Sequence, residues 1–557
     1  MMGIMQVKSL LIMAATVVVH SSFTLSIPFG KPLVETKYGM ITGKTTHFSD
    51  ENSDIKYVNT FLGIPYASPP VHGLRFKPPE PPSAWKPKIY NATYFRNVCA
   101  QDRSDYFKNS IRLVWPDFTW EKDSSEDCLY LNVFAPGRNA TNTSRQLYPV
   151  IMFIHGGSYV YGTTARHTTP GEVLPRWGVV LVTIQYRLGA FGFLTTGDDN
   201  ASGNWGMLDQ VEALRWIQEN IQAFGGDKNS VTILGVSSGG ASVGLHLLSP
   251  LSKGLFHRAI AESGVEFSSF AFSTVEKAVN KTKTAAKKLG CDVDNHQEMM
   301  VCLRAKDTNE IIENYEWPFT GPVIDNHFIL DTPKNLRRSG QFHPVPLISG
   351  FNSHEGAHNI RPKYRPPTEI TPAVFREAIE EFVENQTFHK HDVTAALIED
   401  AIEFQYTPWG KPPDSPTFRQ KIVDMQSDYI IAAPTVEVLG IHSQKAPAYM
   451  YLFSHRSQRN TAPAWMGVKH GDNTPYDFGA PFLNITSLNF TEEDRNVSSV
   501  IMSLYANFAK DGAPTPSPVH GVTWGEFNRT HGSYLVIQGN PEMKVNFKPH
   551  RMAFWNS

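Results

Sequence analysis

One serine of the chain lies in a pattern that can turn a hydroxyl group into a nucleophile. Gly235, Ser237 and Gly239 form Gly-x-Ser-x-Gly, which follows an apolar run and precedes a helix-like run that ends near Leu248. In such a turn only glycine two positions before and after the serine avoids a steric conflict, and the turn pushes the hydroxyl out above a sheet. Glycine and serine are common, so the pattern is informative mainly through its flanks. It predicts that Ser237 attacks the carbonyl carbon of a carboxylic ester.

A glycine-rich turn can supply hydrogen-bond donors for the negative charge that such an attack creates. The apolar run 150–154 leads directly into His-Gly-Gly-Ser at residues 155–158. Backbone N–H groups aimed at the developing oxyanion are the usual means of stabilising it. We therefore expect an oxyanion hole formed by the N–H groups of Gly157, Ser158 and Ser238. The less favoured alternative for the two glycines is an ordinary tight turn.

A serine nucleophile also needs a histidine to accept its proton and a carboxylate to hold the tautomer of that histidine. Where this elbow occurs, the partners follow in the order serine, acid, histidine, each in a loop after a later strand. Glu355 and His470 each follow a strand-like run, so we assign them as acid and base. His354 and His520 are less suitable, because His354 precedes the acid at the wrong strand end and His520 lies in a loop with no strand before it.

These residues must be positioned by a sheet, and the pattern of apolar residues predicts one. Leu208, Val211, Leu214, Ile217 and Ile221 have the three- and four-residue spacing of a helix face. Around this helix lie apolar runs of strand length at residues 150–154, 179–184, 231–234, 345–349 and 448–453. Strands without polar alternation indicate a parallel sheet covered on both faces. The fold class is α/β, a large and mostly parallel central sheet with helices on both faces, in a single domain over residues 27–557.

The N-terminus has the composition of a signal peptide. Lys8 is followed by an apolar run at residues 10–19 and by small and polar residues at 20–22. We predict a signal peptide over residues 1–22, with cleavage between residues 20 and 26. The run is too short to span a bilayer and no later stretch approaches about 20 apolar residues, so a secreted, extracellular protein without a transmembrane anchor is expected. A net charge of -2 offers no basic surface for nucleic acid.

The cysteines and the Asn-x-Ser/Thr sequons agree with secretion. Four cysteines without metal-ligand spacing fit two disulfides, for which three pairings are possible. Cys291 and Cys302 are close enough in sequence to close a small loop, which leaves Cys99 with Cys128. Ten sequons are candidate glycosylation sites at the surface, namely Asn91, Asn139, Asn142, Asn200, Asn280, Asn385, Asn484, Asn489, Asn496 and Asn528.

Further motifs make the chain similar to a known family. They are residues 61–67 (FLGIPYA), 73–76 (GLRF), 126–132 (EDCLYLN), 186–189 (YRLG) and 204–210 (NWGMLDQ). With the serine, acid and histidine loops, they resemble the type-B carboxylesterase and cholinesterase family from about residue 32 to residue 555. The resemblance implies an α/β-hydrolase fold and a serine esterase with a Ser-His-Glu triad, an acyl-enzyme intermediate and no cofactor or metal.

The resemblance also assigns residues around the triad. It implies the disulfides Cys99–Cys128 and Cys291–Cys302, in agreement with the spacing. It further implies a structural ion pair between Arg75 and Glu126, and a supporting contact from Ser263 to the acid.

Departures from the family pattern bear on the substrate. Cholinesterases have an acidic residue before the nucleophile, where this chain has Val236. At the position of their choline-binding tryptophan this chain has Phe118, although Trp120 is two positions away. Because a quaternary ammonium group is held mainly by cation–π contact, for which tryptophan is the best ring, choline esters are not expected to be preferred. Trp317 and Phe319 stand where the family lines its acyl pocket, although they could equally be ordinary core aromatics. A small-molecule or lipid ester is expected, with acyl length and oligomeric state left open.

Two alternatives remain beside the carboxylesterase reading. One is a cholinesterase-like enzyme. The other is a binding protein, because the family includes neuroligin-like adhesion molecules without catalysis, which residues 155–159 and 195–198 resemble. Those adhesion proteins typically replace a triad residue and carry a transmembrane helix, whereas this chain keeps all three triad residues, which favours an enzyme.

Overall fold

The computed structural model describes residues 31–49, 53–112, 114–120, 122–137, 147–315, 321–386, 394–410, 414–483 and 489–557. Several predictions of the sequence analysis fall outside these ranges. They are the signal peptide, the pocket residues Trp317 and Phe319, and the sequons at Asn139, Asn142 and Asn484.

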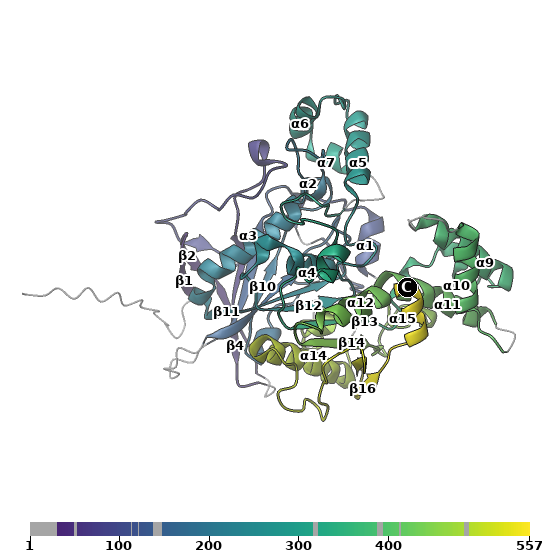
Figure 1. The fold of residues 1–557 in the computed structure, drawn as a ribbon. Helices are drawn as coiled ribbons and strands as arrows, with labels where there is room; N and C mark the ends of the chain where they lie inside the picture. The colour runs from purple at the N-terminus through teal and green to yellow at the C-terminus, as the bar shows by residue number, and fades with distance from the viewer. Residues whose placement is uncertain are drawn as a thin grey trace, which may run out of the picture.

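A large twisted sheet runs through the centre of the molecule (Figure 1). Its eleven described strands are, in spatial order, β16 (Glu542–Val545), β15 (Ser533–Ile537), β14 (Ala448–Phe453), β13 (Leu347–Asn352), β12 (Arg258–Glu262), β11 (Gly226–Val236), β9 (Tyr148–Ile154), β10 (Val180–Ile184), β8 (Tyr130–Pro136), β4 (Tyr57–Pro65) and β3 (Lys44–His47). Neighbours from β10 to β15 are parallel, and antiparallel pairs occur only toward the two edges.

Side chains of the central strands alternate between two hydrophobic cores. In β9, Met152 and Ile154 point into one core, whereas Ile151 and Phe153 point into the other. Successive side chains of a strand point to opposite faces, so a strand that is apolar throughout must be covered on both sides. This accounts for the absence of polar alternation in the sequence of β9.

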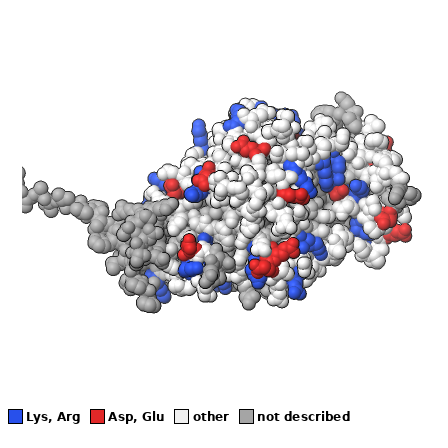
Figure 2. All heavy atoms as spheres, turned by 90° about the horizontal axis from the view of Figure 1, so that it is seen from below, with Lys and Arg blue, Asp and Glu red and all other residues white. Residues whose placement is uncertain are grey.

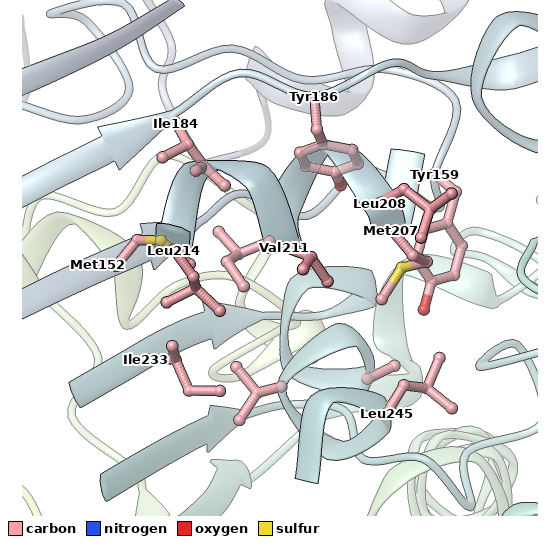
Figure 3. Close-up of a cluster of buried hydrophobic side chains, with 14 of the residues drawn as sticks. Met152, Tyr159, Ile184, Tyr186, Met207, Leu208, Val211, Leu214, Ile233 and Leu245 are labelled. Carbon is pink, nitrogen blue, oxygen red and sulfur yellow. The ribbon is translucent and has the colours of Figure 1, made fainter. Parts of the chain in front are cut away.

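Helices cover both faces of the sheet. Helices α3 (Trp205–Asn220), α4 (Ser238–Leu248) and α12 (Ala433–His442) cover one face, and the long helix α14 (Glu492–Asp511) covers the other. Figure 3 shows the first core, where Val211 and Leu214 of α3 and Leu245 of α4 meet Met152 and Ile233 of the strands. The predicted fold class is therefore confirmed.

The remaining described helices lie mainly in two helical segments that connect strands and project from the sheet, both visible in Figure 1. The first contains α5 (Val275–Lys288), α6 (His296–Ala305) and α7 (Thr308–Asn314), and the second contains α9 (Pro372–Asn385), α10 (Ala395–Tyr406) and α11 (Ser415–Ser427) with its own apolar cluster. Shorter elements are β1 (Leu33–Thr36), β2 (Gly39–Thr42), β5 (Tyr90–Asn91), β6 (Val98–Cys99), β7 (Ser124–Ser125), α1 (Asp105–Arg112), α2 (Gly189–Phe193), α8 (Pro333–Arg338), α13 (Thr474–Asp477) and α15 (Pro549–Asn556).

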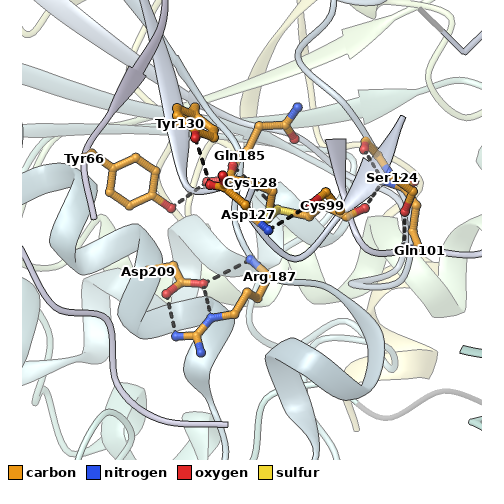
Figure 4. The surroundings of a disulfide bond; sticks show 12 residues. Tyr66, Cys99, Gln101, Ser124, Asp127, Cys128, Tyr130, Gln185, Arg187 and Asp209 are labelled. Atoms are coloured by element: carbon orange, nitrogen blue, oxygen red, sulfur yellow. Dashed lines mark hydrogen bonds and ion pairs between the residues drawn. A yellow bond between two sulfur atoms is a disulfide. The ribbon is translucent and has the colours of Figure 1, made fainter. Parts of the chain in front are cut away.

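Two disulfides are present, with the predicted pairing. Cys99–Cys128 joins cysteines that are 29 positions apart in the sequence, and Cys291–Cys302 joins cysteines that are 11 positions apart. Figure 4 shows the first in a polar setting that includes Gln101, Ser124 and a buried Arg187–Asp209 ion pair. The ion pair between Arg75 and Glu126 that the resemblance implies is also present.

The surface bears both signs of charge. On the face seen in Figure 2, lysine and arginine are interspersed with aspartate and glutamate, so this face has no large area of one sign. Among the sequons in the described ranges, Asn91, Asn200, Asn280, Asn385, Asn489 and Asn496 are exposed, and Asn528 is half-buried. Over the same ranges, no helix combines the length and the apolar character needed to cross a membrane.

Candidate active site

The predicted nucleophile lies at a sharp turn between a strand and a helix. Ser237 follows the last residue of β11 and precedes α4, with φ 60° and ψ −124°. A Cβ atom at Gly235 would lie 2.2 Å from the carbonyl oxygen of Gly239, and one at Gly239 would lie 2.1 Å from that of Ile154. Both glycines are therefore required by close backbone approach. A serine in this backbone region costs about 1–3 kcal/mol, which the surrounding fold must offset.

The structure brings the predicted acid and base into direct contact. His470 Nδ1 lies 2.5 Å from Glu355 Oε2, and the carboxylate is only 1% exposed. The other oxygen, Oε1, accepts hydrogen bonds from the hydroxyl of Ser263 (2.5 Å) and from the backbone N–H of Asn352 (2.7 Å). Three donors fix the carboxylate, so it can in turn fix the orientation of the imidazole ring.

The environment keeps Glu355 ionised. Burial alone would raise the pKa of this carboxyl group, but the charge of His470 and the hydrogen bonds from His470, Ser263 and Asn352 lower the pKa below its ordinary value. An ionised carboxylate at Nδ1 holds a proton on that nitrogen. The other ring nitrogen, Nε2, is then the one able to accept a proton.

The nucleophile and the base are both open to solvent. Ser237 is half-buried, and the side chain of His470 is 20% exposed. Within the described part of the chain, the hydroxyl of Ser237 has no hydrogen-bond partner. In structures without substrate, the bond between nucleophile and base is often long and tightens only when substrate binds.

Among the described residues, the three predicted oxyanion donors have backbone N–H groups without an acceptor. Gly157 and Ser158 make no hydrogen bond through their N–H groups to any described residue, and Ser238 is the first residue of α4, whose N–H has no acceptor in its own helix. Gly157 has φ 107°, and a Cβ atom there would lie 1.8 Å from the carbonyl oxygen of Tyr161. The turn thus requires glycine at this position, as an oxyanion-binding loop does.

Sequence reasoning missed a second histidine at the site. The ring of His358 stacks on that of His470, with centroids 4.9 Å apart and planes inclined by 24°. Its Nδ1 lies 2.9 Å from the carbonyl oxygen of Glu355, and burial lowers the pKa of His358 to about 4. A neutral ring therefore covers one face of the base. Its position three residues after the predicted acid was the available signal.

The two competing histidines lie elsewhere. His354 packs its ring against Gly467, and its Nδ1 is bonded to the hydroxyl of Ser353 at 2.8 Å. His520 is exposed in a turn between Val519 and Val522. In the described structure, neither imidazole ring bonds to the carboxylate of Glu355.

The predicted substrate-pocket residues are unsuited to a cation. Val236 is a buried neutral side chain beside the nucleophile. Phe118 is 1% exposed and contacts Trp120 edge to face, at 4.9 Å between centroids. The guanidinium group of Arg103 lies 5.3 Å from the centre of the Trp120 ring, so this ring already has a cation beside it. Over the described ranges, no group of three or more His, Cys, Asp or Glu side chains could hold a metal ion.

Comparison with known proteins identifies the family of the chain. The sequence model of the carboxylesterase family matches residues 30–555. The chain is 33% identical to neuroligin-2 of Mus musculus over 569 residues, which is 94% of this chain and 67% of that protein. It is 34% identical to neuroligin-3 of Mus musculus over 573 residues, which is 94% of this chain and 68% of that protein. This chain belongs to the carboxylesterase family.

Proposed function

We propose that the protein is a secreted serine hydrolase of carboxylic esters. The observation that carries the proposal is the contact between His470 and the buried, triply hydrogen-bonded carboxylate of Glu355. A buried charge and a strained serine are both costly to stability. Catalysis is a use that needs both together, because the acid orients the base and the turn presents the nucleophile.

The residues support an acyl-enzyme mechanism. His470 Nε2 takes the proton of the Ser237 hydroxyl while Oγ attacks the ester carbonyl, and the resulting oxyanion accepts hydrogen bonds from Gly157, Ser158 and Ser238. When the intermediate collapses, the proton passes from His470 to the departing alcohol. A water molecule, activated by the same imidazole, then hydrolyses the ester bond to Ser237 and releases the carboxylic acid.

Neutral esters are the proposed substrates. Val236 places no negative charge beside the nucleophile, and Arg103 already lies beside the Trp120 ring. A cationic alcohol group would therefore gain neither an ion pair nor the better of the two aromatic faces. A small-molecule or lipid ester with an uncharged alcohol portion fits these surroundings.

Hydrolysis of p-nitrophenyl acetate and butyrate by the purified protein tests the proposal. Wild type should release p-nitrophenolate steadily, and Ser237→Ala should not. Ser104→Ala is a matched control, since Ser104 is exposed and, among the described residues, its hydroxyl bonds only to Asp102. Turnover that survives in Ser237→Ala would reject Ser237 as the nucleophile.

A binding function is the second candidate, because the neuroligins match 94% of this chain. On this alternative the fold would serve adhesion, and the triad geometry would be unused. A folded wild-type protein that hydrolyses no ester and takes no label at Ser237 would favour the binding function over the enzyme.

A further inference from the structure

Two carboxyl groups lie buried together behind the candidate triad. Glu262 and Asp477 are each 1% exposed, and their side chains are within hydrogen-bonding reach of one another. The side-chain amide of Asn473 donates to both, at 3.1 Å to Glu262 Oε2 and 3.1 Å to Asp477 Oδ2. Over the described ranges, neither carboxyl group forms an ion pair with lysine, arginine or histidine.

Such a pair cannot carry two negative charges at ordinary pH. Like charges in contact and out of water disfavour double ionisation, as in other carboxyl pairs that share a proton. Burial raises the pKa of Glu262 above its usual range, and burial together with the charge of Glu262 raises the pKa of Asp477 well above its usual range.

The hydrogen bonds indicate where the proton resides. Glu262 accepts from the hydroxyl of Tyr505 through Oε1 and from Asn473 through Oε2, so it is surrounded by donors. Asp477 Oδ1 is buried and has no donor beside it in the described structure. A proton on Asp477 gives that oxygen a partner, since it can then be donated to the carboxylate of Glu262.

The pair joins the two backbone segments on which the triad depends. Glu262 ends β12; its carbonyl oxygen accepts the N–H of Ser237 at 2.8 Å, and the next residue, Ser263, bonds to Glu355. Asp477 ends α13, the helix that begins four residues after His470. A bond between Glu262 and Asp477 therefore ties the segment that supports nucleophile and acid to the segment that follows the base.

Asn473 extends the connection to the acid. Its Oδ1 accepts from the side-chain amide of Asn352 at 3.2 Å, and that amide also donates to the carbonyl oxygen of Lys469 at 2.8 Å. The backbone N–H of Asn352 bonds to Glu355. The acid pair and Glu355 thus belong to one continuous buried network.

We propose that Glu262 and Asp477 share one proton and form a clamp that positions the loop of His470 against Glu355. Both are positioning residues, because neither touches the triad through its side chain. The inference deepens the proposed esterase function and rests on it for its catalytic part. The proton stays on Asp477 throughout the reaction and is donated to Glu262, so the clamp adds no proton to the chemistry.

The surroundings define how the clamp responds to pH. Tyr505 of α14, Tyr451 of β14 and Asn473 face the pair, and Glu355 and His470 lie further along the network. Both tyrosines stay neutral, because burial raises the pKa of each well above its usual range. Without a facing cation, loss of the shared proton leaves two like charges in contact, so alkaline pH weakens the clamp.

Thermal unfolding between pH 5 and 8 tests the shared proton without reference to catalysis. When folding raises the pKa of a carboxyl group, the contribution of that group to protein stability falls as the pH rises from the unfolded pKa of about 4 toward the folded pKa. Asp477→Asn replaces the acid with a permanent neutral donor. The Tm of this variant should therefore increase relative to the Tm of wild type as the pH rises. If the Tm curves of the two proteins run parallel, the proposal that Glu262 and Asp477 share a proton is wrong.

Turnover tests the positioning role. Asp477→Ala, which removes the donor, should lower kcat by about tenfold to 100-fold with little change in KM. Asp477→Asn, which keeps a donor at this position, should have a kcat near that of wild type. If Asp477→Ala does not fold, Asn473→Ala removes the bridge to both carboxyl groups and should lower kcat in the same way. Asp428→Asn is the matched control, since Asp428 is a buried acid that bonds instead to Arg551 and Tyr406.

The outcomes separate the two proposals. Diverging Tm curves with a kcat unaffected by Asp477→Ala would overturn the positioning role alone. A wild type without turnover would reject the esterase, while the Tm curves would still decide whether the proton is shared.

Discussion

Replacing Glu355 with glutamine should remove nearly all activity while preserving the shape of the site. Oε1 of Glu355 accepts from the backbone N–H of Asn352, a donor that cannot be reversed, so the amide nitrogen of glutamine must take the place of Oε2. There it faces His470 Nδ1, which must then accept a hydrogen bond. The proton of the imidazole moves to Nε2, and the ring can no longer take the proton of Ser237.

The size of this effect follows from the role of the tautomer. A carboxylate-to-amide change at the equivalent place in a serine triad lowers kcat about 10⁴-fold, or about 5.4 kcal/mol at 1.36 kcal/mol per tenfold. We expect a loss of that order in kcat for p-nitrophenyl butyrate, with KM nearly unchanged. Glu377→Gln is the control, because Glu377 is exposed and pairs with Lys363. A Glu355→Gln protein that keeps kcat within about tenfold of wild type would refute the assignment of the acid.

Three further predictions concern the surroundings of the site. Ser263→Ala removes one of the donors to Glu355 and should lower kcat by about tenfold to 100-fold, whereas Ser349→Ala, which removes a buried hydroxyl bonded to a backbone carbonyl of β12, should cost stability alone. Acetylcholine should be hydrolysed with a kcat/KM no more than a few times that of its neutral carbon isostere, and a preference of 100-fold or more would contradict the account of the pocket. Replacing Cys99 and Cys128 with alanine should lower the free energy of unfolding by about 3–4 kcal/mol, measured by urea denaturation, while the esterase activity of the protein that remains folded at low temperature stays near wild type.

Glu355 also links stability to pH. Its folded pKa lies below the ordinary value, so it contributes stability above the unfolded pKa of about 4.3, and this contribution is lost as the pH falls through the folded pKa. Below about pH 4, the Tm of wild type should therefore fall relative to the Tm of Glu355→Gln. A difference that is constant from pH 3 to 7 would contradict the depressed pKa.

The central strands were predictable because their burial leaves a direct trace in the sequence. The run 448–453 coincides with β14, and β9, β10, β11 and β13 overlap their predicted runs with ends shifted by a few residues. β12 was missed, since its five residues begin with Arg258 and end with Glu262. These charged end residues interrupt the apolar pattern that is expected of a strand in the middle of a sheet.

The site was predictable where the backbone imposes residue types and where the order of the loops assigns the partners, as for Glu355 and His470. Other contacts across the fold were not predictable. The glycines at 235, 239 and 157 are required by close approach, so they mark the elbow and the donor loop in the sequence itself. The contact of His358 with His470 leaves only one trace in the sequence, the position of His358 three residues after the acid. Nothing in the sequence places Asp477 beside Glu262, because these two residues are separated by 215 positions in the chain. Such pairs are set by strand order, which local patterns do not encode.

The central claim is that Ser237 is a nucleophile activated by His470 and Glu355, and covalent labelling tests it most directly. The folded protein would be incubated with a fluorophosphonate, and the site of modification would be located by peptide mass spectrometry in wild type, His470→Ala and Ser237→Ala. We predict one phosphonyl adduct on Ser237 in wild type, labelling slowed by several orders of magnitude in His470→Ala, and none in Ser237→Ala. A folded wild type that takes no label, or that takes it equally well without His470, would contradict the account.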